Sequence, residues 1–76
     1  MTAKDSNNKT IREADWIICN NRMYQVHFIF DKQLIMVWWQ YTKKNKKVIR
    51  LSRARIILTD SVVKVDPPIA YNITDE

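Results

Sequence analysis

The sequence predicts an all-β fold, a small barrel or rolled antiparallel sheet of five to six short strands. Apolar and polar residues alternate over short runs that are rich in β-branched and aromatic side chains. Clusters of Asn, Asp, Lys or Ser separate these runs, and no long stretch shows helical periodicity. The expected strands are residues 16–19, 23–30, 34–41, 48–51, 55–58 and 62–65.

The chain has 76 residues, of which 46% are hydrophobic, which is enough for one small domain with a core. We expect this domain to span residues 15–66, after a mobile polar lead-in over residues 1–14. In the lead-in, an extended path is favoured over a single helical turn at Thr10. The two prolines after Asp66 end regular pairing, so residues 67–76 are expected to be a tail that can dock as an edge strand.

The chain contains no glycine, so its tight turns must use other residues. Asparagine tolerates a positive φ better than the other residues, and Asn20 with Asn21 therefore predicts a tight hairpin between the first two strands. Residues 31–33 and the lysine-rich residues 43–47 are the next predicted turns. The lack of glycine also excludes glycine-based phosphate loops of the P-loop and dinucleotide types.

Alternation assigns one face of each strand to the core. For residues 23–30 the more apolar face is taken as the inward one, and it carries Tyr24, Val26, Phe28 and Phe30. Ile49 is expected to point inward from the fourth strand. Trp38 and Trp39 are adjacent and must point to opposite faces; Trp39 shares a face with apolar neighbours, so Trp38 is the outward one.

Basic residues are concentrated in one part of the chain. Residues 32–59 hold eight Lys or Arg and no Asp or Glu, in a chain of formal charge +5. Such a surface suits an anionic partner, because lysine and arginine bind phosphates by charge and arginine also by a bidentate fork. The candidate nucleic-acid-binding residues are Lys43, Lys44, Lys46, Lys47, Arg50, Arg53 and Arg55, with Trp38 as a ring that can stack on a base.

The order of a basic strand, a one-turn break over residues 52–54 and another strand resembles an SH3-like barrel. Within that class, the segment VIRLSRARII, residues 48–57, is similar to the equivalent region of the C-terminal DNA-binding domain of retroviral integrases. The resemblance covers about a third of the chain and implies a DNA-binding surface on these strands.

We therefore expect a small nucleic-acid-binding protein, with DNA favoured over RNA, that serves as an accessory protein of a phage, plasmid or transposable element. The alternative is a protein-interaction module or an inhibitor of a host protein that acts through the aromatic third strand. A homodimer built on that strand is a variant of this alternative.

Catalytic and metal chemistry find no support in the residue types. His27 and Cys19 are the only residues of their kind, so no metal-ligand set can be built around them, and no cofactor is expected. No acid–base pair or small-molecule site is recognisable, and we expect no enzyme activity. The longest apolar run, residues 34–39, is too short to span a bilayer, and a cytoplasmic location is expected.

Overall fold

The computed structural model describes residues 2–58, 61–68 and 73–74, and this part of the chain is all-β, with no helix. Its strands are β1 (Ala3–Lys4), β2 (Thr10–Ile11), β3 (Trp16–Cys19), β4 (Arg22–Ile29), β5 (Leu34–Thr42), β6 (Lys47–Ile57), β7 (Val63–Val65) and β8 (Ile73–Thr74). The absence of a helix also means that these residues contain no helical membrane span. The predicted fold class is confirmed.

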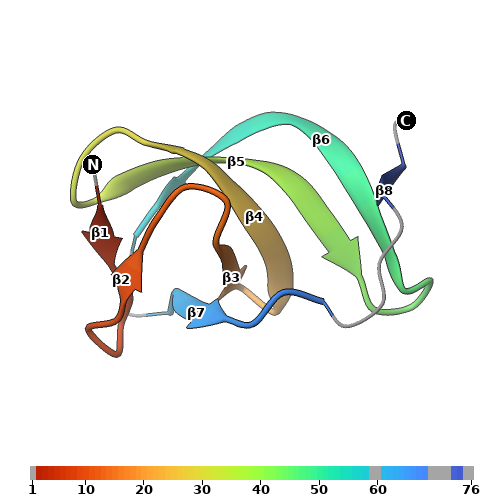
Figure 1. Cartoon of the computed structure of the whole chain (residues 1–76), viewed down its shortest axis with the longest axis horizontal. Helices are drawn as coiled ribbons and strands as arrows, with labels where there is room; N and C mark the ends of the chain where they lie inside the picture. The colour runs from red at the N-terminus through yellow and green to blue at the C-terminus, as the bar shows by residue number, and fades with distance from the viewer. Residues whose placement is uncertain (1, 59–60, 69–72, 75–76) are drawn as a thin grey trace.

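The main sheet has the strand order β7-β3-β4-β5-β6-β8, and a separate pair is formed by β1 and β2. All neighbours are antiparallel except β6 and β8, which are parallel. Figure 1 shows β4, β5 and β6 arching over β3, β7 and the β1–β2 pair. The sheet is rolled but is not closed into a barrel, since β7 and β8 are its two edges. This arrangement is compatible with an SH3-like fold.

The turns use asparagine and aspartate as the sequence predicts. Asn20 and Asn21 have φ values of 53° and 64°, and they form the whole loop between the paired residues Cys19 and Arg22. Two positive φ values are what a tight hairpin requires for its loop to match the twist of the strands. At the next turn, Asp31 Oδ1 accepts hydrogen bonds from the backbone N–H groups of residues 33 and 34 at 2.7 and 2.9 Å.

The core fills the concave side of the rolled sheet as two clusters. The larger one joins β1 and β2 to the central strands, and its fully buried side chains include Ile11, Ile17, Ile29, Ile35 and Val37. The smaller cluster packs Trp16, Trp39 and Val48 together. Trp39 is 8% exposed, so its predicted inward position is confirmed.

The predicted phase of β4 is wrong from residue 28 onwards. Phe28 is 46% exposed, whereas Val26 and Ile29 are buried. Val26 is paired with Val37 and Phe28 with Met36, so His27 is an extra residue in β4. An extra residue shifts the alternation by one position, and Ile29 therefore takes the inward place that the sequence pattern gave to Phe28.

Two predictions for β6 are also wrong. No break separates two strands at residues 52–54, because β6 runs without interruption as an 11-residue strand with a register irregularity opposite residues 37–39. Ile49 is only half-buried, and Val48 is the fully buried residue that packs with Trp16 and Trp39. Val48, and not Ile49, therefore faces the core, where it packs with Trp16 and Trp39.

Both ends of the chain contribute strands to the fold. The segment expected as a lead-in carries β1 and β2, and it buries Ala3, Asp5 and Ile11. Its extended path at Thr10 is confirmed. In the expected tail, β8 pairs with β6 at the edge of the sheet, as the alternation predicts, while residues 69–72 and 75–76 lie outside the described residues.

Candidate functional site

The candidate site lies at Trp38, where the pairing of β5 with both of its neighbours, β4 and β6, is irregular. On one side, Gln25 is paired with Trp39 and Val26 with Val37, which leaves Trp38 opposite no single residue of β4. On the other side, Val37 is paired with Ala54 and Trp39 with Arg50, so Trp38 faces the three unmatched residues 51–53 of β6. Irregularities of this kind bend a strand and change the direction of its side chains.

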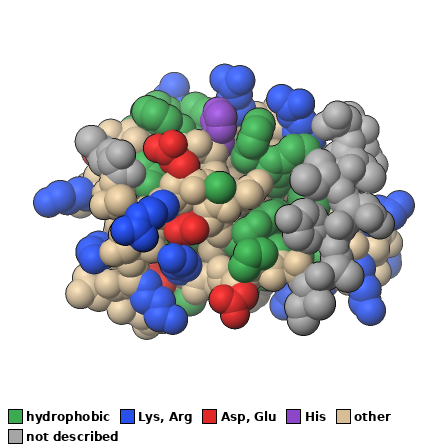
Figure 2. Space-filling model, in the orientation of Figure 1, with side chains coloured by type: hydrophobic (Ala, Val, Ile, Leu, Met, Phe, Trp, Pro, Cys, Tyr) green, Lys and Arg blue, Asp and Glu red, His purple; other side chains and the backbone are tan. Residues whose placement is uncertain are grey.

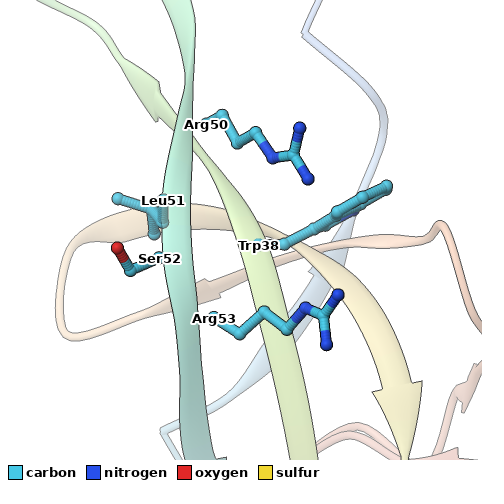
Figure 3. A pocket seen from close by; sticks show the side chains of 5 residues that line it. All are labelled: Trp38, Arg50, Leu51, Ser52 and Arg53. Atoms are coloured by element: carbon cyan, nitrogen blue, oxygen red, sulfur yellow. The ribbon is translucent and has the colours of Figure 1, made fainter. Parts of the chain in front are cut away.

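This local geometry brings Arg50 and Arg53 to the same side of β6. In a regular strand, residues three positions apart point to opposite faces. Here the extra residues in β6 undo that alternation, and Figure 3 shows both arginine side chains reaching past β5 on the two sides of Trp38. Leu51 and Ser52, between them, point the other way in the same view.

The result is a shallow pocket of about 250 Å³, lined by Trp38, Arg50, Leu51, Ser52 and Arg53. We call it the Trp38 pocket. Arg50 Cζ lies 5.5 Å from the centroid of the Trp38 ring and 6.0 Å from that of Trp39, within the range of a cation–π contact. The pocket therefore presents two guanidinium groups beside a flat indole.

Two neighbouring rings, His27 on β4 and Trp39 on β5, contact the Trp38 ring. His27 stacks on it, with centroids 4.6 Å apart and planes at 26°. The Trp39 ring meets it at 5.4 Å and 60°. His27 and Trp38 are the residues that have no partner in the β4–β5 register, and they pack on each other. Trp38 is half-buried on the convex face, and its predicted outward position is confirmed.

A second aromatic and cationic group lies on the same convex face. Phe28, Met36 and Arg55 form one cross-strand row over β4, β5 and β6. Phe28 contacts Phe30 edge to face at 5.2 Å, and Arg55 Cζ lies 5.6 Å from the centroid of the Phe30 ring. We call these four residues the Phe28 row. The sequence pattern assigned Phe28 and Phe30 to the core, because the irregularities that bring them to the surface leave no local signal.

The predicted basic residues form a track and not one cluster. Arg50 and Arg53 meet at the Trp38 pocket, and Arg55 lies over Phe30. The four lysines are exposed at the turn between β5 and β6 and at the start of β6. Lys47 is paired with Thr42 and Arg55 with Met36, six residues apart on β5, so at about 3.4 Å per residue the track is roughly 20 Å long.

Negative charge is absent from this track. No carboxylate of the described residues pairs with Arg53 or Arg55, and residues 32–59 contain no Asp or Glu. Figure 2 shows several Lys and Arg side chains along the upper edge of the view, where β6 runs in Figure 1.

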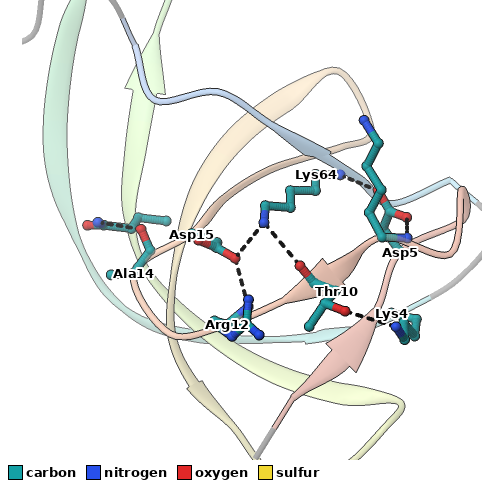
Figure 4. A network of polar contacts seen from close by, with 9 residues as sticks. Lys4, Asp5, Thr10, Arg12, Ala14, Asp15 and Lys64 are labelled. Atoms are coloured by element: carbon teal, nitrogen blue, oxygen red, sulfur yellow. Dashed lines mark hydrogen bonds and ion pairs between the residues drawn. The ribbon is translucent and has the colours of Figure 1, made fainter.

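A different group of charges joins β7 to the N-terminal strands (Figure 4). Asp5 is 7% exposed, and its carboxylate accepts backbone hydrogen bonds from Asn7, Lys9 and Lys64, each at 2.8 Å. Lys64 Nζ in turn lies 3.2 Å from Asp15 Oδ2 and donates to the carbonyl oxygen of Thr10 at 3.1 Å. We call this network the Asp5 clasp.

The clasp determines the ionisation of Asp5. Burial alone would raise the pKa of this carboxyl, but the three backbone N–H groups and the nearby charge of Lys9 together hold it below its ordinary value of 3.8. Asp5 is therefore ionised in the folded protein, with its lone pairs used within the fold. This group is a structural network that joins β7 to the N-terminal strands.

Metal-binding groups are not assembled in the described part of the chain, where no three His, Cys, Asp or Glu residues come together. Cys19 is a free thiol that is buried in the larger core cluster. Its position beside Val26 and Ile17 is that of a small apolar side chain.

Comparison with known proteins identifies no relative: no protein-family model matches the chain, and neither the curated proteins nor the solved structures contain a match.

Proposed function

We propose that this protein binds nucleic acid, with DNA favoured over RNA, through the convex face of β4, β5 and β6. The observation that carries this proposal is the placement of Arg50 and Arg53 on the two sides of Trp38, within residues 32–59, which contain no Asp or Glu. Guanidinium groups bind phosphate oxygens by charge and by paired hydrogen bonds. The pocket offers two of them within reach of one backbone segment.

The mode of binding that this surface supports is mainly electrostatic. Exposed lysines at the β5–β6 turn and arginines along β6 can follow a phosphate backbone over the length of the strand. Neutralising phosphates releases condensed counterions, so affinity should fall steeply as salt rises. Sequence-specific readout is not part of the proposal, because no recognition helix is present among the described residues.

The resemblance of residues 48–57 to the DNA-binding domain of retroviral integrases agrees with this proposal, since those residues coincide with β6. An accessory role in a phage, plasmid or transposable element would suit a short basic protein of this kind. Both statements rest on residue types along one strand and are part of the proposal.

The test replaces Arg50, Arg53 and Arg55 by glutamine and measures duplex DNA affinity against salt. We expect weaker binding and a slope of log K on log salt that shrinks by about one unit for each phosphate that the variant no longer binds. The matched control removes three positive charges elsewhere, with Lys4, Lys9 and Arg12 replaced by glutamine, and should keep most of the slope. Equal binding by the parent and the arginine variant, or no parent binding to duplex or single-stranded DNA at low salt, would overturn the proposal.

A protein partner is the second candidate, because two large apolar side chains are exposed on the same face. Phe28 is 46% and Ile57 is 68% exposed. An interface built on them, including a homodimer, would bury apolar area and would be nearly insensitive to salt. Gel filtration of the protein with and without a short duplex separates the two candidates.

A further inference from the structure

The exposed ring of Phe28 narrows the class of nucleic acid that this face can bind. Phe28 projects from β4 because the extra residue His27 changes the phase of the strand. Its ring is held edge to face by Phe30 at 5.2 Å and shares a cross-strand row with Met36 and Arg55. An aromatic ring fixed from one side and open to solvent is a platform on which another flat ring can stack.

Trp38 is less suited to this task than the sequence alone suggests. His27 stacks on its ring at 4.6 Å, and the Arg50 guanidinium lies over the same ring at 5.5 Å. A base that stacks on Trp38 would have to share the ring with these two groups. Phe28 is 46% exposed and contacts Phe30 edge to face, so we assign the stacking position on this face to Phe28.

Stacking on a side chain requires an unpaired base. In a duplex the faces of the bases are covered by their neighbours, whereas single strands offer them to aromatic platforms whatever the sequence. The Phe28 row and the Trp38 pocket are also adjacent, since Met36 and Trp38 are two residues apart on β5. That separation is about 7 Å, which is the length that two nucleotides of a stacked strand cover at roughly 3.4 Å each.

We propose that the preferred ligand of this face is single-stranded nucleic acid, with a base stacked on Phe28 beside Arg55 and the neighbouring phosphates held by Arg50 and Arg53. Positive charge on the face and the absence of acids within residues 32–59 match such a strand. This inference rests on the proposed function and adds the strandedness of the ligand and the stacking residue.

The experiment compares a labelled 12-nucleotide oligothymidylate with a 12-base-pair duplex, both titrated at low salt by fluorescence anisotropy. We expect the parent protein to bind the single strand more tightly. The Phe28→Ala variant should lose roughly 5- to 150-fold in single-strand affinity, as the removal of a stacking ring does, with less than a 2-fold change for the duplex. Phe28→Tyr, which keeps a ring, should retain the affinity of the parent.

Two controls keep the outcomes distinct. Ile57→Ala removes an exposed apolar side chain that has no ring, on β6, and this variant should bind as the parent does. A loss confined to the Phe28 variants would then be due to stacking and not to general apolar contact. Circular dichroism should show that Phe28→Ala is folded, because the side chain lies outside the core. If that variant proves unfolded, Phe28→Leu, which keeps apolar bulk without a ring, replaces it and should show the same selective loss.

The inference is overturned if folded Phe28→Ala or Phe28→Leu binds oligothymidylate as well as the parent does. In that case the proposed function still stands if the variant with Arg50, Arg53 and Arg55 replaced by glutamine loses duplex binding. It is also overturned if the parent prefers the duplex, or if Phe28→Ala abolishes a concentration-dependent dimer and leaves DNA binding unchanged. Binding of neither probe by the parent would remove the proposed function itself.

Discussion

The Asp5 clasp and the Trp38 pocket both bring charged side chains together, yet the charges have opposite uses in the two places. In the clasp, a buried carboxylate accepts three backbone hydrogen bonds, and a lysine joins it to a second carboxylate through the sheet. In the pocket, two guanidinium groups flank an indole, and residues 32–59 around them include no acid.

The difference separates charges that hold the fold together from charges that face a partner. A buried ion is tolerated only where the fold supplies its hydrogen bonds, because water no longer does. Exposed arginines are under no such requirement, and pairs at a surface contribute little to stability. Mutations in the clasp should therefore change stability and leave binding unchanged, and mutations at the pocket should do the reverse.

The largest effect is expected for Asp5→Ala. Removing the Asp5 carboxylate leaves three backbone N–H groups without an acceptor. Each one that water cannot reach lowers the free energy of unfolding by about 1 to 3 kcal/mol. We expect a loss of roughly 3 to 5 kcal/mol, which approaches the whole stability of a domain of this size. Urea denaturation followed by tryptophan fluorescence measures it.

The matched control is Asp31→Ala. Asp31 also accepts two backbone hydrogen bonds, from Gln33 and Leu34, but it lies at an exposed turn where water can replace it. We expect a cost of about 1 kcal/mol there. Equal losses for the two variants would mean that burial does not distinguish the clasp, and the comparison would fail.

A smaller effect is expected from acid. The pKa of Asp5 is lower in the folded protein than its ordinary value of 3.8, so the unfolded chain binds the proton more readily. The stabilisation is therefore complete above the ordinary value and is lost as pH falls through the folded value. Urea unfolding of the parent and of Asp5→Asn at pH 6 and below pH 4 should show a steeper acid loss for the parent. Parallel pH profiles would contradict the assignment.

The smallest effect on stability is expected for the double variant Arg53→Gln and Arg55→Gln. Both side chains are exposed, and neither pairs with a carboxylate of the described residues. We expect the free energy of unfolding to change by no more than about 0.5 kcal/mol, the usual range for surface substitutions. If the free energy of unfolding falls by more than about 1 kcal/mol, the contacts between arginine and aromatic side chains stabilise the fold, and the pocket does not differ from the clasp in this respect.

Local residue patterns were sufficient to predict β3, β4, β5 and the turns between them, but not β1, β2 or the uninterrupted β6. β3 begins and ends at the predicted residues, β4 and β5 agree with the prediction to within one residue at each end, and the two-asparagine hairpin is present. The signals were short alternating runs and residues that accept positive φ, both of which depend only on neighbours in sequence. Sheet closure depends on distant pairing, and the sequence did not reveal that β7 and β8 remain edges.

The site was predictable in its charges and not in its geometry. The arginines and Trp38 are exposed or half-exposed as expected, because residue types alone favour those positions. The irregularities opposite Trp38 were not visible in the sequence, since an extra residue is defined only against the register of the partner strand. For the same reason Phe28 was assigned to the core.

The glycine-free turns have a consequence for the unfolded chain. Among the described residues, the positive φ positions are occupied by Asn8, Ala14, Asn20, Asn21 and Lys46. Ala14 is the least suited of these to a left-handed conformation, at a cost of about 1 to 2 kcal/mol in the folded state. Every non-glycine residue, however, narrows the range of conformations open to the denatured ensemble, by about 0.4 to 1 kcal/mol at a compatible turn. Compared with glycine, asparagine at these turns lowers the conformational entropy of the unfolded chain and so favours folding. This is an advantage in a domain whose core is small.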